Sequence, residues 1–232
     1  NQLMIGNISA NFKSTSNNPN KAESKKPFLV KSHDIVAENF KFDAGKHYNL
    51  NVKSILNSDK KTIVKHLELK PKYSRKAFSK LIKKQEDLYD ISVKEISVFE
   101  NLDIFSGFEI INLKQVTLDG INASIYHDLA PPNDTKHRTL FSEKLRSIKT
   151  PLFIEEVDIK NSYISYEEDA LNNNKPGKFF MDQFNTTINN VGNGKIAKLP
   201  TLVNVKAHFN VFGTAHSKVN WTFDVLNKMD DF

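Results

Sequence analysis

The sequence predicts a mainly β fold of the β-rich α+β class: a twisted antiparallel sheet or an open β-groove, with one or two short helices. Three observations predict it. Apolar and polar residues alternate along several segments, turn-forming residues separate those segments, and two short stretches have helical apolar spacing instead. Because 39% of the 232 residues are hydrophobic and 26% are charged, the composition is ordinary for a globular protein. We expect residues 1–232 to form a single β-rich domain or a segment of a longer repeat protein.

The clearest alternation lies in two segments, one central and one near the C-terminus. Successive side chains of a strand point to opposite faces, so each segment would present one apolar face. A final strand over 219–225 would pair with the second segment through a connection at 213–218. The alternating apolar residues, which we predict to line an apolar groove, are Ile121, Ala123, Ile125, Val203, Val205, Ala207, Phe209 and Val211.

The N-terminal region is predicted to hold two strands that pair around a linker. Residues 13–26 contain no apolar residue larger than Ala22, so their burial would not offset the entropy lost on ordering. We therefore expect a mobile loop or linker there. Short apolar clusters over 3–12 and 28–42 flank it and would form the two strands.

Two interruptions of the strand pattern are predicted to be helical. Ser74 would cap the first helix, and the second lies between Thr139 and Pro151. Since both separate groups of strands, we expect helices that cover one face of the sheet in preference to a parallel βαβ alternation. Apolar positions of the first helix would share one side: Phe78, Leu81, Ile82 and Leu88.

Turns and one irregularity complete the predicted sheet. The alternation changes phase between Ile154 and Val157, which predicts a bulge or bend near Glu155 and Glu156. Strands of similar length between regular turns favour an antiparallel meander. Turn-forming residues cluster at four places: Asp119-Gly120, 131–134, 172–177 and 192–194.

No catalytic apparatus is predicted. The chain has no cysteine and none of the common nucleophile, phosphate-binding or dinucleotide-binding motifs. The nearest approach to a constellation is His127, Asp128, Asp134 and His137, and an exposed loop explains these four residues better than a metal or hydrolase site does. We therefore expect a non-enzymatic protein with no catalytic, cofactor-binding or metal-binding residues and no cofactor.

The net charge of +6 does not single out a nucleic-acid partner. Much of the positive charge lies over 21–31 and 70–84, where a linker and a helix face in water account for it. Aromatic residues such as Phe209 and Trp221 fall in the apolar phase of predicted strands, which favours core packing over base stacking. We predict that no nucleic acid is bound.

Several segments resemble AsmA-like proteins, in the form found in Bacteroidetes-type bacteria. Residues 67–71 (LELKP) precede the Phe78 helix, and ASIYHD at 123–128 precedes PPND at 131–134. The stretch VDIKNSYISYEE at 157–168 is similar to a strand of the type v-x-i-x-n-g-x-i-x-Y-x-E, with Ser162 in place of the usual Gly. The resemblance spans roughly residues 45–232, and the C-terminal hairpin looks like the repeating strand pairs of this group.

Membership of the AsmA/TamB family would imply a non-enzymatic cell-envelope module in the periplasm. Such a module would shield or transfer phospholipid acyl chains along an apolar β-groove in outer-membrane biogenesis. The resemblance implies an inner-membrane anchor outside this segment, and the first residue, Asn1, suggests a fragment. The alternative is a structural or adhesive β-domain that binds protein or glycan through its loops. Ligand identity, transport direction and oligomeric state stay open.

Overall fold

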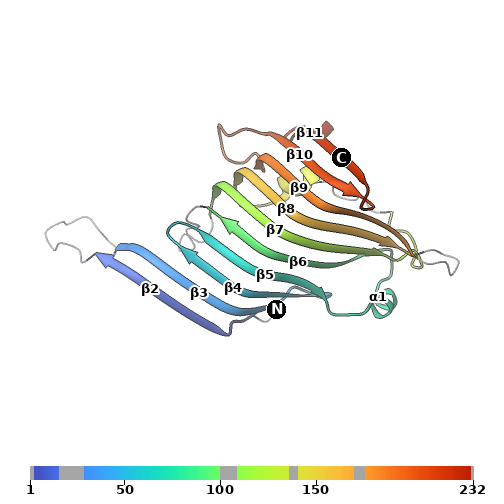
Figure 1. The fold of residues 1–232 in the computed structure, drawn as a ribbon, viewed down its shortest axis with the longest axis horizontal. Helices are drawn as coiled ribbons and strands as arrows, with labels where there is room; N and C mark the ends of the chain where they lie inside the picture. Colours follow the sequence, from blue (N-terminus) through green and yellow to red (C-terminus); the bar gives the residue numbers. More distant parts are fainter. Residues whose placement is uncertain (1–2, 16–28, 100–108, 136–140, 170–175, 231–232) are drawn as a thin grey trace.

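The computed structural model describes residues 3–15, 29–99, 109–135, 141–169 and 176–230. One mixed sheet of eleven strands forms almost the whole of this part, and it is strongly twisted and curled (Figure 1). Its order is β1-β3-β4-β5-β6-β7-β8-β9-β10-β11, with β2 also paired to β3, and its two edges do not meet. The predicted mainly β, open architecture is confirmed. The strands are β1 (Leu3–Met4), β2 (Asn7–Thr15), β3 (Leu29–Asp43), β4 (Tyr48–Ser58), β5 (Thr62–Pro71), β6 (Asp87–Val98), β7 (Ile111–His127), β8 (Leu152–Glu168), β9 (Gly177–Gly192), β10 (Leu202–Val211) and β11 (Ala215–Asp224).

One junction departs from the predicted antiparallel meander. Strands β7 and β8 are parallel, whereas every other neighbouring pair among the described strands is antiparallel. Strand β8 starts beside the first residue of β7, so residues 128–151 connect the two strands by a crossover from one end of the sheet to the other. The helix α2 (Phe141–Ser147) lies within this crossover. The expectation of helices that cover one face of the sheet, in preference to a parallel βαβ alternation, is therefore wrong at this one place. A parallel pair needs a long crossover, so the helix that separates these strand groups is part of that connection.

The N-terminal strands pair as predicted, but the linker is shorter. Strand β2 pairs with β3 from Asn7 to Thr15, so residues 13–15 of the predicted mobile loop belong to a strand. Backbone pairing to β3 extends the strand into polar sequence, because ladder hydrogen bonds do not depend on side-chain burial. Residues 16–26 of that loop lie outside the described part of the chain. A short 3₁₀ turn at Lys228–Asp230 ends the described structure.

The two predicted helices are present. Helix α1 (Arg75–Leu81) is capped by Ser74, whose Oγ accepts a hydrogen bond from the Ala77 N–H at 3.4 Å. The helix ends at Leu81, so the prediction that it extends to Leu88 is wrong, and Leu88 lies in β6. Leu88 still packs with Phe78, because α1 folds back against the outer face of β6 and β7.

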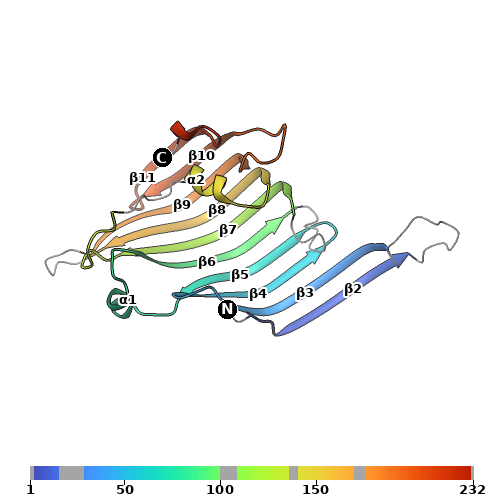
Figure 2. The same cartoon turned by 180° about the vertical axis from the view of Figure 1, so that it is seen from behind.

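Helix α2 lies on the opposite, inner face of the curled sheet (Figure 2). Its Leu145 side chain is 7% exposed and packs against Val203, Phe223 and Val225. The Arg146 guanidinium donates a 2.9 Å hydrogen bond to the backbone carbonyl of Val225. The last strands and α2 together form the main hydrophobic core.

A line of residues with positive φ crosses the middle of the sheet. The register aligns them across the sheet although they come from five strands, and in two of these strands the polar pairs Lys65-His66 and Lys160-Asn161 are exposed on this line. Apolar residues on either side are spaced three positions apart, as Leu118 and Ile121 are. The strands therefore skip one position here, which keeps their apolar side chains on the inner face while the sheet bends. The five residues are Asn39, His66, Gly120, Asn161 and Gln183.

Of two sequence predictions about irregularities, the turn at Asp119-Gly120 is wrong and the bend near Glu155 is confirmed. Asp119-Gly120 is not a turn, because both residues lie inside β7 and Gly120 supplies the positive φ of +67°. A bend of the same kind lies at Glu155, which is missing from the pairing of β8 with both of its neighbours although the register is kept. Ile154 and Val157, three positions apart, pack on the same face, and Asn190 of β9, opposite Glu155, has a positive φ of +62°. The register shifts of β8 against β9 lie further along, between Ile159 and Ile164.

Candidate functional site

The inner face of the sheet carries a continuous row of apolar side chains. Residues that are register partners in neighbouring strands share a face, so one row can be followed from β3 to β11. All nine of its members are apolar. We call this inner face, centred on the row, the trough. The row consists of Phe42, Leu50, Leu69, Ile91, Ala123, Ile164, Met181, Val211 and Ala215.

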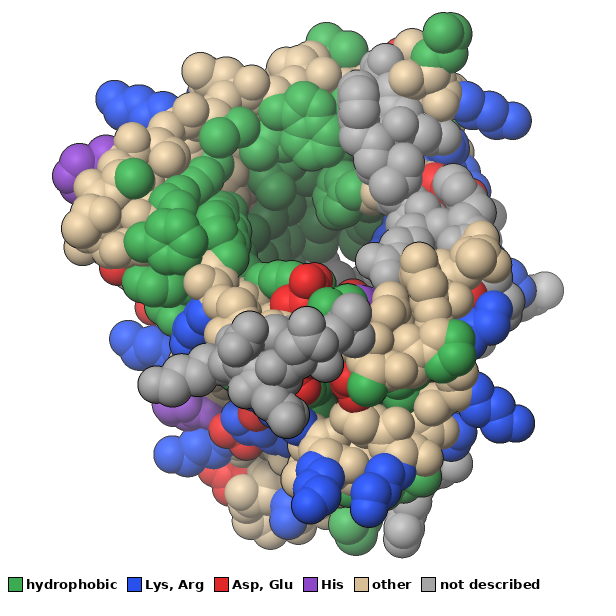
Figure 3. All heavy atoms as spheres, turned by 90° about the vertical axis from the view of Figure 1, so that its right-hand side faces the viewer, with side chains coloured by type: hydrophobic (Ala, Val, Ile, Leu, Met, Phe, Trp, Pro, Cys, Tyr) green, Lys and Arg blue, Asp and Glu red, His purple; other side chains and the backbone are tan. Residues whose placement is uncertain are grey.

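Within the described part of the chain, no second layer of structure covers the trough along this row. Only Ala123 is buried, at 9% exposure, while its neighbours Ile91 and Ile164 are half-buried and Ala215 is exposed. Seen from the end of the sheet that carries α1, the molecule has a hollow lined by hydrophobic side chains (Figure 3). A sheet face in a closed sandwich would be buried much more completely. The trough is therefore an open apolar concavity.

All eight residues predicted to line a groove lie in the apolar phase of β7 and β10. Val203 is fully buried, and with Val205 it packs into the core beneath Leu145 of α2. These two residues therefore lie at the end that α2 covers, whereas Ala123 and Val211 belong to the central row. The other predicted residues, Ile121, Ile125, Ala207 and Phe209, are half-buried.

The next row of the trough, which we call the aromatic row, has three aromatic residues and Ile125, and it lies two positions nearer the end shown in Figure 3. Tyr89 pairs with Ile125, Ile125 with Tyr166, and Tyr166 with Phe179. Tyrosine joins an apolar ring to a polar hydroxyl, so it suits a boundary between apolar and wet surroundings. The row marks such a boundary between the trough and its mouth.

Polar side chains form the last row, at the mouth of the trough. Asp87 pairs with His127 and His127 with Glu168, and we call these three residues the polar row. His127 Nδ1 lies 2.7 Å from Asp87 Oδ1, and its side chain is 5% exposed. The hydroxyl of Tyr89 donates to Asp87 Oδ2 at 3.1 Å, and that of Tyr166 donates to Glu168 Oε2 at 3.0 Å. The mouth is thus an ordered polar rim directly beside aromatic and apolar rows.

Sequence reasoning did not find the polar row. The signal was present, because the alternation that includes Ile125 continues to His127, and the one that includes Tyr166 continues to Glu168. Strands often end in a polar residue, so a polar residue in the apolar phase at the end of one strand does not by itself indicate a site. Only the register brings such residues from β6, β7 and β8 into one row.

The outer face beside the mouth holds α1 by charge pairs. Arg75 Nη1 donates to Glu167 Oε2 at 2.7 Å, and its guanidinium lies 4.5 Å from the centre of the Tyr126 ring. The hydrogen bond from Arg75 holds the pKa of Glu167 below its usual value. Burial, and then a hydrogen bond to Asp169, raise the pKa of Tyr126 well above its usual value. Lys178 Nζ, 3.4 Å from Glu167 Oε1, completes the cluster.

The constellation weighed from sequence does not come together in the described residues. His127 is paired with Asp87, the Asp128 carboxylate accepts a 2.9 Å hydrogen bond from the Ala130 N–H, and Asp134 lies 3.1 Å from Lys84 Nζ. His137 lies outside the described part of the chain. Within that part, no three His, Cys, Asp or Glu side chains are grouped so as to hold a metal ion.

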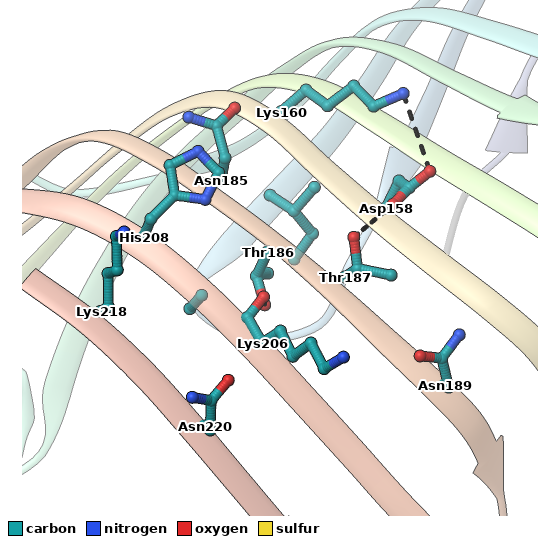
Figure 4. Close-up of a pocket in the computed structure, with 12 residues that line it drawn as sticks. Asp158, Lys160, Asn185, Thr186, Thr187, Asn189, Lys206, His208, Lys218 and Asn220 are labelled. Atoms are coloured by element: carbon teal, nitrogen blue, oxygen red, sulfur yellow. Dashed lines mark hydrogen bonds and ion pairs between the residues drawn. The ribbon is translucent and has the colours of Figure 1, made fainter.

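A second concavity, which we call the outer pocket, lies on the polar face of β8 to β11 (Figure 4). It encloses about 610 Å³. The Thr187 hydroxyl donates to Asp158 Oδ1 at 2.8 Å, and Lys160 Nζ lies 3.7 Å from Asp158 Oδ2. The rim of this pocket is basic and rich in amides, with Lys206, Lys218, Asn189 and Asn220.

Comparison with known proteins assigns no family. No family model matches the chain, and no curated protein matches it. In the described part of the chain, no helix is both long enough and apolar enough to span a bilayer. The class of protein rests on the fold: an open, curled, mainly β sheet with an apolar inner face.

Proposed function

We propose that this chain is a non-enzymatic lipid-handling module that shields acyl chains from water in the trough. The observation that carries the proposal is the register row of nine apolar residues, which crosses nine strands and which no other described residues cover as a second layer. An apolar face this extensive is unfavourable in water unless something covers it. An acyl chain is a suitable cover, because its burial is favourable by about 0.8 kcal/mol for each methylene.

We further propose that the chain belongs to the AsmA/TamB class of envelope proteins and works in the periplasm, attached to the inner membrane by an anchor outside this segment. The open curled sheet and its apolar inner face support this class. Phospholipid transfer in outer-membrane biogenesis would then be its role. Localisation of the tagged full-length protein by fractionation of inner membrane, periplasm and outer membrane tests the placement, and recovery in the cytoplasm would reject it.

Lipid extraction tests the main proposal. The purified chain is incubated with vesicles of mixed bacterial phospholipids, recovered by size exclusion, extracted and measured by mass spectrometry. We expect phospholipid to remain with the protein in a fixed molar proportion. Recovery of protein without any lipid would reject acyl-chain carriage.

A matched pair of variants in β7 localises the lipid to the trough. Ile121→Glu places a carboxylate on the half-buried inner face, whereas Asn122→Glu places one at the adjacent exposed outer position. We expect the first variant to lose bound lipid and the second to retain it, because an ionised group strongly disfavours an apolar contact. If Ile121→Glu fails to fold, Phe179→Glu serves instead, since Phe179 is already 40% exposed. Equal lipid in the inner and outer variants would contradict the proposal.

The outer pocket favours a second candidate, a structural or adhesive domain that binds glycan. Its volume of about 610 Å³ and its amide and lysine side chains suit a sugar that carries negative charge. This candidate predicts that Asn220→Ala and Lys206→Ala abolish binding on a glycan array, while extracts of the purified protein contain no lipid. If the protein binds no glycan on the array, this candidate function is rejected.

A further inference from the structure

Towards the mouth of the trough, the inner face changes from apolar to polar in the same order as a phospholipid does from its acyl chains to its headgroup. Along β6, β7 and β8, residues of the inner face pass from the apolar row to the aromatic row and then to the polar row. Each step is two residues, or about 7 Å along a strand. A lipid whose acyl chains lie in the trough would therefore place its glycerol region at the aromatic row and its headgroup at the polar row.

The polar row favours a positively charged headgroup. Its carboxylates, Asp87 and Glu168, face the mouth on the inner side, and the row contains no Lys or Arg. Figure 3 shows acidic side chains at the lip of the hollow, while Lys and Arg lie around the outer margin. The hydroxyls of Tyr89 and Tyr166 donate to these two carboxylates and so fix their positions.

Nearby cations on the outer side are engaged elsewhere. Arg75 and Lys178 both pair with Glu167, whose side chain belongs to the outer phase of β8. Lys84 pairs with Asp134 in the loop after β7. The basic group within the polar row is His127, which is buried against Asp87. Counting the described residues, the inner lip therefore presents net negative charge to whatever occupies the trough.

We propose that the trough selects phospholipids whose headgroup carries a primary amine, such as phosphatidylethanolamine, over those with an uncharged glycerol headgroup. An ammonium group donates three hydrogen bonds to carboxylate acceptors, and the faces of Tyr89 and Tyr166 are suited to contact with a cation. A glycerol headgroup offers no positive charge to offset the two carboxylates. This inference rests on the proposed lipid-handling function and adds a headgroup class to it.

Competition between two headgroups tests the inference. The probe is a vesicle with equal molar amounts of dioleoyl phosphatidylethanolamine and dioleoyl phosphatidylglycerol, so that the acyl chains are identical. The whole chain is incubated with these vesicles, separated from them and extracted, and both lipids are quantified by mass spectrometry. We expect about threefold enrichment of the amine lipid over its share in the vesicles, the size of a partly exposed charge pair.

Variants tie that selectivity to the polar row. Glu168→Gln, alone and together with Asp87→Asn, should bring the ratio of the two bound lipids close to that of the vesicles. Glu68→Gln, on the outer face of β5, is the matched control and should keep the enrichment. The single variant keeps the test decisive if Asp87→Asn unfolds the chain by releasing His127.

The possible outcomes separate the two proposals. Bound lipid with no preference, or with preference for the glycerol headgroup, overturns the headgroup inference and leaves acyl-chain carriage standing. Enrichment that persists in Glu168→Gln and in the double variant overturns the role of the polar row. Absence of both lipids overturns the proposed function itself, and the headgroup inference with it.

Discussion

The Nδ2 atom of Asn161 donates a 2.7 Å hydrogen bond to Oδ1 of Asp119, across the parallel junction of β7 and β8. Asn161 has a φ of +52°, and Gly120, the neighbour of Asp119, has a φ of +67°. On the other side, Asp119 Oδ2 lies 3.7 Å from Lys94 Nζ of β6. Polar side chains on the outer face thus connect three strands at the line where the sheet bends.

Asn161 should be replaceable by glycine more readily than by alanine. Both substitutions remove the hydrogen bond to Asp119, but only alanine adds the strain of a Cβ at positive φ, because asparagine and glycine tolerate this region. We expect Asn161→Ala to lower the free energy of unfolding by about 1 kcal/mol more than Asn161→Gly does. Urea denaturation followed by circular dichroism measures both. Equal losses would mean that the positive φ is not needed.

Gly120 should tolerate alanine less well than Gly45 does. Both have positive φ, but a Cβ on Gly120 would lie 3.0 Å from the Cβ of Lys94, whereas one on Gly45 would meet nothing within 4 Å. We expect Gly45→Ala to cost about 1 kcal/mol and Gly120→Ala to cost more, because its Cβ would also crowd the Lys94 side chain of β6. Thermal unfolding of the two variants compares them, and a smaller effect at Gly120 would refute the argument.

Helix α1 should depend on one side chain for its docking. Phe78 is fully buried against Leu88 and Tyr126, whereas Leu81 of the same helix is 42% exposed. We expect Phe78→Ala to destabilise the fold by about 3 to 5 kcal/mol and Leu81→Ala by less than about 1 kcal/mol. Chemical denaturation of both variants provides the measurement. Similar losses at the two positions would show that α1 is not anchored through Phe78.

The Arg75–Glu167 pair should contribute to stability only above acidic pH. Because the hydrogen bond from Arg75 lowers the pKa of Glu167 in the folded state, the contribution is complete above the ordinary glutamate pKa of about 4.3 and is lost as pH falls through the lowered value. Arg75 is 45% exposed, so the contribution is at most about 1 kcal/mol.

Glu167→Gln therefore should reduce the loss of stability between about pH 6 and about pH 3, measured by urea denaturation at each pH. Glu109→Gln, at an exposed position ahead of β7, should leave that loss unchanged and serves as the control. An unchanged acid dependence in Glu167→Gln would show that the pair contributes nothing to the folded state.

The alternation of apolar residues was sufficient to predict the class of fold. Ile121, Ala123 and Ile125 lie on one face of β7, and Val203 to Val211 lie on one face of β10, as period two requires. The parallel junction was not predictable, because alternation is the same in parallel and antiparallel strands. Asp119-Gly120 was mistaken for a turn because a positive φ within a strand attracts the same residue types as a hairpin turn.

The candidate site was predicted in part for a similar physical reason. Apolar lining follows from a pattern within one strand, so Ile121 and Ala207 could be named from sequence. The polar row depends on register between strands: Asp87 and Glu168 are far apart in the chain and meet only through the alignment of both with His127. Sequence alone offers no measure of that alignment without related sequences or coordinates.

The parallel junction between β7 and β8 has a consequence for the order in which the protein folds. Within the groups β3 to β7 and β8 to β11, strands that follow each other in the chain are also neighbours in the sheet. Each group can therefore form its strand pairs one after another through local contacts. Pairing β7 with β8 requires closure of the long crossover that contains α2. This step is expected to be slower, because closing a longer loop costs more conformational entropy. In pulsed hydrogen exchange during refolding, amides bonded within each group should therefore become protected before the amides that bond β7 to β8, near the pair Leu113 and Ile154. Simultaneous protection would argue against separate folding of the two groups.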